Sequence, residues 1–290
     1  MRKTLLALVL LAVPASAVGE EAAAPAAPAA PAVVAGLAMA TVAGSGAITD
    51  AVAFAQAPLS KVAMLPQVVT TPRELAPATA SLDVRAVRND DHAGFLLEWD
   101  DDSADVRVTI DGFGDMVAVE IPVAAGPLPP APFMGNKDGR VNILQWRADW
   151  QTDVDKGAVT IRELYPNAYA ADFYHVDHLP AAAAAPYQGA VSLGNPMSDQ
   201  HRTSSVQDLM AEGFGSLTPR TTQAAAGRGT HDGKRWHVVI TRPLAATGDS
   251  AASLAPGTAT QVAFAVWNGS HSEVGSRKAW AAWMPLAVPQ

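Results

Sequence analysis

Short apolar runs separated by turn residues fill most of the chain after about residue 48, and several of them alternate apolar with polar positions. A period of two is typical of strands with one buried face, and regularly spaced short runs are typical of all-β folds. No alternation of strands with helices and no internal repeat is present. The pattern predicts a mainly β fold, an antiparallel β-sandwich or barrel with a few short helices. We expect strands at 82–87, 95–99, 106–110, 116–123, 141–150, 158–164, 236–241 and 261–267.

One segment, 205–212, has the pattern of a helix instead. Ser205 stands at a capping position, and Asp208 follows three residues later, close to a capping box. Three apolar side chains then share one helical face, and Gly213 is suited to the C-terminal stop. We therefore expect a short helix here, and a long loop at 167–200, where no apolar period is present.

The N-terminal segment 1–17 has the three parts of a secretory signal. Arg2 and Lys3 precede an apolar run at 5–13, and small residues at 15–17 form a cleavage site. The apolar run is too short to span a bilayer. We expect export to the periplasm, with no membrane span after signal cleavage.

Segment 18–47 begins with an Ala/Pro-rich stretch and continues with small apolar residues, a composition typical of a linker. We expect the folded domain to be 48–290. The formal net charge of the chain is −8, or −10 once Arg2 and Lys3 are lost, which argues against a nucleic-acid partner. The chain contains no cysteine, so any metal or cofactor must be held by other side chains and without thiolates.

Met134 is the first candidate ligand. It stands in a turn rich in Pro, Gly and Asn, directly before an apolar segment that contains two tryptophans. A thioether at the tip of a loop can be offered to a soft metal centre, although methionine more often fills a gap in a core. Both interpretations are open from the residues alone.

Lys278 is the second candidate. Together with Arg277 it follows a polar turn after Trp267 and opens a last apolar segment with two further tryptophans. The two cations could be solvated in a hairpin loop, which is the common case. Alternatively, Lys278 points inward, and burial then lowers its pKa and leaves a neutral amine that can bind a metal.

A third group, His175 and His178 with Asp177 between them, matches no standard zinc spacing. Hydrolase, P-loop and zinc-protease motifs are missing from the sequence. Two classes of function are open from these residues. One is an exported carbohydrate-binding β-sandwich with exposed aromatic residues, and the other is a copper-binding periplasmic protein that uses Met134, His175 and His178.

Four separated blocks of the sequence, in a fixed order, carry a family resemblance. They are Phe133-Met134-Gly135 with Val141-Asn142-Ile143 and Trp146-Arg147-Ala148-Asp149; Gly194-Asn195-Pro196 with 204–214; Gly227-Arg228-Gly229 with Asp232-Gly233 and 236–244; and 264–269 with Gly275 and Arg277-Lys278. The chain resembles the haem b-binding γ subunits of periplasmic type II molybdoenzymes of the dimethyl sulfoxide reductase family. Ethylbenzene dehydrogenase, dimethyl sulfide dehydrogenase, chlorate reductase and selenate reductase belong to this group.

The resemblance implies one non-covalent haem b with Met134 and Lys278 as the axial iron ligands. Gly135, Asn142 and Trp146 lie in the matched block around Met134, and Arg277 adjoins Lys278, so we expect these four residues to contact the cofactor as well. Trp267 and Trp280 are further candidates for packing on the macrocycle. Arg147 stands where the family has lysine, and we expect it not to touch the iron ligands.

The resemblance also implies partners. They are a molybdopterin-containing α subunit, an iron–sulfur β subunit in the same heterotrimer, and a soluble c-type cytochrome. Catalysis would take place in the α subunit, so we expect this chain to be a non-catalytic electron-transfer subunit of an oxidoreductase complex. The substrate of that complex and the direction of electron flow do not follow from the sequence.

Overall fold

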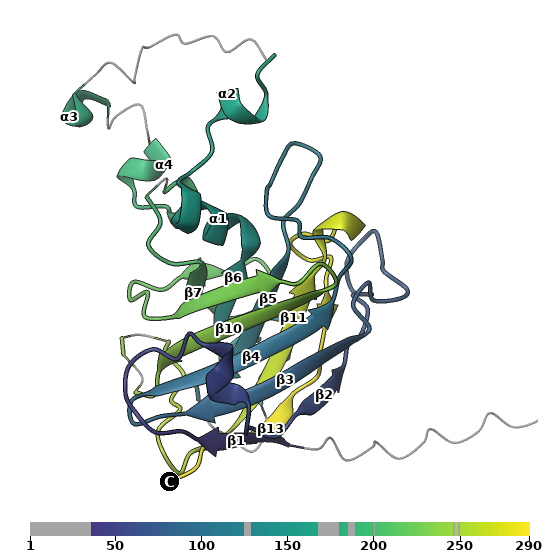
Figure 1. Ribbon diagram of the computed structural model, residues 1–290, viewed down its shortest axis with the longest axis vertical. Helices are drawn as coiled ribbons and strands as arrows, with labels where there is room; N and C mark the ends of the chain where they lie inside the picture. The colour runs from purple at the N-terminus through teal and green to yellow at the C-terminus, as the bar shows by residue number, and fades with distance from the viewer. Residues whose placement is uncertain are drawn as a thin grey trace, which may run out of the picture. The chain divides into compact units, whose positions relative to one another are not determined.

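The strands form two layers that pack face to face (Figure 1). One layer follows the order β8–β7–β6–β5–β11, with β12 added to β11, and the other the order β3–β4–β10–β9, with β2 added to β3. Their bounds are β2 (Ser60–Ala63), β3 (Ser81–Arg88), β4 (His92–Asp100), β5 (Met116–Pro122), β6 (Val141–Arg147), β7 (Val206–Ala211), β8 (Thr218–Pro219), β9 (Ala226–His231), β10 (Arg235–Pro243), β11 (Ala259–Trp267) and β12 (Ala279–Trp280).

Two strands, β1 (Leu37–Thr41) and β13 (Met284–Ala287), join the layers into one continuous sheet. β13 pairs with β11, and β1 lies between β13 and β3. The two pairings of β1 are parallel, whereas all the other pairings among the described strands are antiparallel. The expected mainly β sandwich is confirmed.

The computed structural model describes residues 36–124, 129–167, 180–184, 189–199, 201–245, 247–248 and 250–290, which belong to one compact unit. The expected signal peptide, most of the expected linker and the pair His175 and His178 lie outside these residues. The helices in the described part are α1 (Ala148–Lys156) and the single turns α2 (Ile161–Leu164), α3 (Ala181–Ala184) and α4 (Gly189–Ser192). None of the helices in this part is long and apolar enough to cross a bilayer.

The main core lies between the layers and is centred on three tryptophans. The rings of Trp99 and Trp236 stack at 6.1 Å, and Trp146 meets Trp236 edge-on at 5.0 Å. All three are buried, and aliphatic side chains from both layers surround them. Aromatic residues bury more apolar area than any others, so this cluster dominates the stability of the sandwich.

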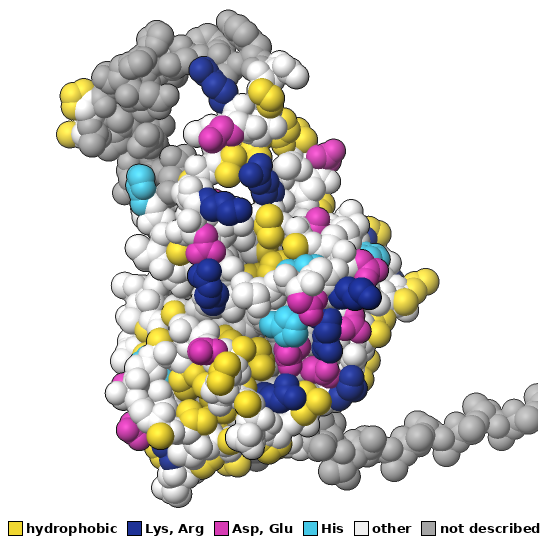
Figure 2. Space-filling view, viewed as in Figure 1, with side chains coloured by type: hydrophobic (Ala, Val, Ile, Leu, Met, Phe, Trp, Pro, Cys, Tyr) yellow, Lys and Arg dark blue, Asp and Glu magenta, His cyan; other side chains and the backbone are white. Residues whose placement is uncertain are grey.

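The outer face of the second layer is divided into two parts. The 3-10 helix η1 (Ala51–Phe54) covers one part and buries Phe54 against it. On the other part, basic, acidic and histidine side chains gather (Figure 2). There Glu98 bonds both Arg85, at 2.8 Å, and His237, at 2.7 Å. This half of the face is a solvated network of charges rather than a hollow.

Segment 205–212 is a strand, β7, and the expected helix is wrong. Ser205 does not cap a helix, because its hydroxyl donates to the Gly227 carbonyl at 2.7 Å. Asp208 instead forms a buried ion pair with Arg220. Five of the six side chains of β7 are buried, and pairing with β6 and β8 satisfies its backbone. Tertiary pairing has overridden a local capping pattern.

Two of the expected strands do not form. Segment 106–110 alternates well but has no partner strand, and Ile110 is 87% exposed. Segment 158–164 contains α2 instead of a strand. Alternation alone marks an amphipathic extended segment, and a strand additionally requires a neighbour that supplies its hydrogen bonds.

The expected start of the folded domain at residue 48 is too late. β1 begins at Leu37, inside the segment expected to be a linker, and pairs on both sides. Leu37 and Met39 are buried in the main core. The inward-facing positions of this short strand are the large residues Leu37 and Met39, which alternate with the small residues that indicated a linker.

Candidate functional site

The strands β5, β6 and β11 turn alternate side chains to opposite sides of their layer. One side, the core face, carries Val117, Val119, Leu144, Trp146 and Val266 into the main core. The other side, the cavity face, carries Met116, Ala118, Glu120, Ile143, Gln145, Arg147, Ala265 and Trp267. Small and polar residues are common on the cavity face, so it leaves a hollow on the outside of the sandwich.

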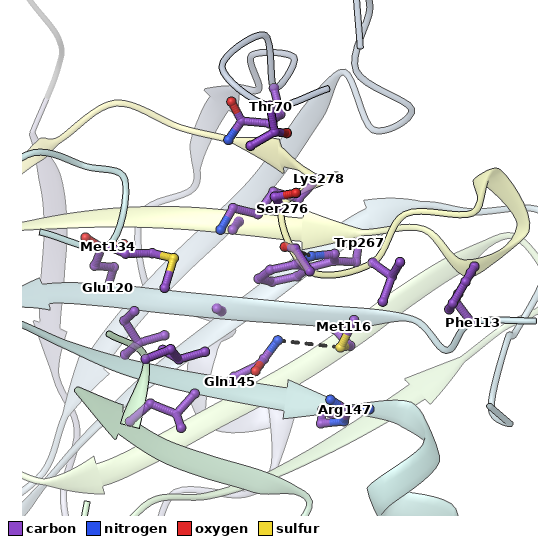
Figure 3. A pocket seen from close by; sticks show the side chains of 18 of the residues that line it. Thr70, Phe113, Met116, Glu120, Met134, Gln145, Arg147, Trp267, Ser276 and Lys278 are labelled. Carbon is purple, nitrogen blue, oxygen red and sulfur yellow. Dashed lines mark hydrogen bonds between the residues drawn. The ribbon is translucent and has the colours of Figure 1, made fainter. Parts of the chain in front are cut away.

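This hollow is a cavity of about 510 Å³ with a mainly apolar lining. Loops close it from above, with contributions from Gln67, Phe113, Met134, Phe214 and Lys278. In Figure 3, Met134 and Glu120 lie at one end of the cavity and Phe113 at the other. Cofactor sites in proteins are commonly apolar pockets of about 300–1,000 Å³ with a few polar groups. The cavity is therefore of the right size and character for an organic cofactor.

Met134 is held by the loop between β5 and β6, which Gly135 shapes. Met134 itself has a φ of 72°, and its carbonyl accepts a hydrogen bond from the Gly213 amide at 2.7 Å. Gly135 has a φ of 73°, and a Cβ on it would lie 2.4 Å from the Gly139 carbonyl oxygen. Only glycine fits there. The turn thus carries the thioether to the cavity at a fixed place.

Lys278 enters the same cavity from the segment before β12. Its Nζ lies 5.0 Å from the centre of the Trp267 ring, and the side chain is half-buried. Burial lowers the pKa of Lys278, and the carboxyl of Glu120 acts in the opposite direction. A buried lysine with a lowered pKa gives up its proton more readily than a solvated one, which favours the amine form that binds a metal.

Glu120 is the only carboxylate among the described residues that line the cavity. It stands in the middle of β5, opposite Ile143 on β6 and Ala263 on β11. The pKa of Glu120 is raised to about 7, mainly because the carboxyl is buried. Lys278 and the backbone N–H groups of Met134 and Gly135 act against this rise. Its Oε1 is buried and has no hydrogen-bond partner.

A ring contact links the segment of Met134 with the segment of Lys278. Phe133, next to Met134, packs on Trp280 with ring centres 4.4 Å apart. The Trp280 indole also donates to the Pro66 carbonyl at 3.0 Å. The neighbours of Met134 and Lys278 are therefore in contact, although the two residues are far apart in the sequence.

Of the six residues expected at the cofactor, Met134 and Lys278 line the cavity and Gly135 shapes its wall. The other three lie elsewhere. Trp146 is in the main core and donates to Gln151. Asn142 is buried in a polar network, where it donates to Asp208 and accepts from Arg242. Arg277 turns away and bonds Glu74 at 3.1 Å.

The expected tryptophan contacts divide in the same way. Trp267 lines the cavity, whereas Trp280 supports Phe133 from behind. Arg147 lines the cavity while paired with Asp149. The sequence analysis did not select Glu120 and Gln145 as site residues. Both could have been found from the sequence. Glu120 is a charge within an apolar strand, and Gln145 lies two residues after Ile143 and so shares its face of the strand.

Comparison with known proteins gives the family. The sequence profile of the family described as ethylbenzene dehydrogenase matches residues 51–279. The chain belongs to this family. The resemblance drawn from the four blocks is thereby confirmed.

Two relatives of this chain agree with this assignment. The chlorate reductase subunit gamma of Ideonella dechloratans is 28% identical over 94% of this chain and 92% of its own length. The putative respiratory nitrate reductase heme subunit ORF7 of Haloferax mediterranei is 26% identical over 70% of this chain and 54% of its own length.

Among solved structures, a family 9 carbohydrate-binding module from Caldicellulosiruptor kristjanssonii, in complex with glucose, covers 84% of this chain and 85% of its own. Its TM-score is 0.35 and its identity 10%, so nothing follows from it for the fold or for sugar binding.

Proposed function

We propose that this protein is a haem b-binding electron-transfer subunit with Met134 and Lys278 as the two axial ligands. The observation that carries the proposal is that these two residues, far apart in the sequence, line the same apolar cavity. The names of the two relatives, a γ subunit of chlorate reductase and a haem subunit, support it.

The residues of the cavity fit the chemistry of a haem. A thioether and an amine are suitable iron ligands, and the apolar lining suits the flat macrocycle. Thr70 Oγ1 is buried at the cavity without a partner, and Arg147 also lines the cavity. Both are polar groups that could meet the haem carboxylates, and Arg147 is at the same time paired with Asp149. Arg277 does not line the cavity, and its guanidinium bonds Glu74.

The protein's own part in the function is positioning. A bound haem supplies one-electron transfer at its iron. Met134 and Lys278 would hold the iron from two sides and leave no place on it for a substrate. The mainly apolar lining of the cavity would keep water away, and a thioether ligand would favour the reduced state and raise the potential. The turn at Gly135 and the contact of Phe133 with Trp280 would keep Met134 and Lys278 in place.

As a subunit, the protein would work with the partners that its relatives imply. We assign catalysis to a molybdenum-containing α subunit and the next electron carrier to an iron–sulfur β subunit, with a soluble c-type cytochrome on the other side. Export to the periplasm belongs to the same proposal. It is supported by the signal-like segment 1–17.

The test is an absorption spectrum of the exported, haem-reconstituted protein before and after dithionite reduction. We expect sharp α and β bands on reduction and a b-type pyridine haemochrome. Met134→Ala and Lys278→Ala should each lose the low-spin spectrum or the haem. Met197→Ala and Lys61→Ala, two exposed residues away from the cavity, serve as matched controls.

The contrary outcomes are distinct. A colourless protein after reconstitution, also in a preparation with its partner subunits, would reject haem binding and redirect the work to glycan and copper binding. An unchanged low-spin spectrum in both ligand variants would reject the ligand assignment alone.

A further inference from the structure

We propose that Glu120 is a positioning residue for both axial ligands, holding the turn that carries Met134 and orienting the amine of Lys278. The inference rests on the proposed function and deepens it. It assigns a role to a buried carboxylate that ligation by a thioether and an amine does not itself require.

The first step of the argument is the place of Glu120 in the sheet. β5 is an interior strand, and the other side chains of its cavity face, Met116 and Ala118, are apolar. A carboxylate at such a position is costly unless polar groups compensate it. Its buried Oε1 nevertheless lacks a hydrogen-bond partner in the described structure. A hydrogen-bond donor that arrives with the cofactor, or that moves when the cofactor binds, would supply the partner that Oε1 lacks.

The second step is the set of polar groups that face the carboxylate. Two of them are the backbone N–H groups of Met134 and Gly135, and the third is the amine of Lys278. Glu120 thus lies between the two segments that carry the proposed ligands.

The third step is the chemistry of an amine ligand. A coordinated lysine uses its lone pair on the metal and keeps two N–H hydrogens. In an apolar cavity these hydrogens need an acceptor, and an acceptor at a fixed place sets the direction of the lone pair. Partners of this kind, outside the ligands themselves, orient the ligands and strengthen their donation. The carboxylate of Glu120 is the acceptor that this cavity offers.

The experiment compares Glu120→Gln with Glu98→Gln in the haem-loaded protein. Both changes replace a carboxylate with an amide, but Glu98 lies on the outer face of the other layer, paired with Arg85. We expect Glu120→Gln to shift the ferric spectrum from low-spin towards high-spin and to weaken haem retention by about 10–100-fold. Electron paramagnetic resonance and haem transfer to apomyoglobin report these two effects. Glu98→Gln should change neither.

A second variant, Glu120→Asp, keeps the charge and shortens the side chain. We expect an intermediate loss of low-spin signal, because the carboxylate is withdrawn from both segments. Circular dichroism establishes that each variant is folded. Should Glu120→Gln fail to fold, the spectrum of Glu120→Asp decides, and a wild-type spectrum there would overturn the inference.

Two further results would overturn it. An unchanged spectrum in Glu120→Gln would show that the carboxylate only fills the wall. Tighter haem binding with an intact low-spin signal would show that Glu120 competes with haem for Lys278. Both results leave the proposed function standing, whereas the absence of a low-spin haem in the wild-type protein would remove the proposed function itself.

Discussion

The two faces of β5, β6 and β11 use the same backbone for opposite purposes. Their core face is filled with large apolar side chains, among them Trp146, and leaves little room. Their cavity face carries small residues such as Ala118 together with the isolated charge of Glu120, and it stays hollow. Because side chains alternate along a strand, a protein can tune stability and ligand binding almost independently on one set of strands. Substitutions on the two faces should therefore separate loss of stability from loss of haem.

The largest loss of stability is expected on the core face, from Trp146→Ala. The ring is fully buried and meets Trp236, so its removal should lower the free energy of unfolding by about 3–5 kcal/mol. Haem should still bind with an unchanged ligand spectrum, because the ring does not line the cavity. Urea unfolding and a haem titration measure the two effects. Loss of the low-spin spectrum in a folded variant would show that the faces are coupled.

Asp115→Asn should come next. Asp115 is fully buried and accepts hydrogen bonds from the backbone amides of Gly269 and Asp105 and from the indole of Trp236. An amide nitrogen would face one of these donors, and we expect a loss of about 1–3 kcal/mol in unfolding free energy with haem binding retained. Chemical unfolding at fixed pH measures the loss.

The same variant has a pH signature. Burial raises the pKa of Asp115 to about 7 from an ordinary value of 3.8. The unfolded chain releases this proton at a lower pH than the folded protein, so the wild type loses stability from this group as the pH rises from 3.8 to about 7. Asp115→Asn has no such group, so the difference in unfolding free energy between the wild type and the variant should become smaller as the pH rises over that range.

Asp232→Asn is the control for that signature. Asp232 is exposed, and the backbone N–H groups of Lys234 and Arg235 lower its pKa to about 2. The stability it contributes is present above 3.8 and is lost as the pH falls towards 2. Its removal should leave the slope between pH 4 and 7 unchanged. A gap for Asp115→Asn that stays constant with pH would contradict the raised pKa.

Gly135→Ala should lower the free energy of unfolding less than the two core substitutions do, but it should weaken haem binding more. Its backbone is left-handed, so alanine is strained there by about 1–2 kcal/mol. The added Cβ would also collide with the Gly139 carbonyl and displace the turn that carries Met134. We expect a shifted Soret band and faster haem loss, measured beside Gly157→Ala, where φ is also positive, at 88°, but no atom crowds the Cβ. Equal haem retention in the two variants would show that the turn does not fix the ligand.

Ala118→Phe should have the smallest effect on stability and the largest on haem. The phenyl ring would extend into the hollow, so the free energy of unfolding should change by about 0.5 kcal/mol or less. The same ring occupies space that the macrocycle needs, and haem titration should detect no binding. A variant that still binds haem with wild-type affinity would place the cofactor elsewhere on the protein.

The sequence allowed much of the fold to be predicted, and the exceptions have physical causes. The runs at 82–87, 95–99, 116–123, 236–241 and 261–267 form strands because apolar alternation and β-branched residues agree there with tertiary pairing. Segment 205–212 was misread because local capping signals do not report the neighbours that a strand will find. β1 was missed because Leu37 and Met39 stand among small residues and because its partners β3 and β13 are remote in the sequence.

The sequence selected two residues that line the candidate site and only part of its walls. Met134 and Lys278 line one cavity, as the family blocks led us to expect. Asn142 and Trp146 were selected because they adjoin Met134 in a matched block, but they alternate with Ile143 and so face the core. The period of two, applied to the block itself, would have selected Gln145 instead. A charge within an apolar strand could also have indicated Glu120, but its contacts with two segments remote from β5 required the three-dimensional structure.

The position of β1 has a consequence for the order of folding. Leu37 pairs with Leu286, and the neighbouring residues of the same strand pair with β3. Contacts between residues so distant in sequence are slow to form, because a long loop must close first. During synthesis β1 therefore cannot pair with β13 until almost all the later strands have been made. Until β13 is made, β1 can pair only with β3, and the edge of β1 that later binds β13 stays unpaired. Such edges invite association with other chains.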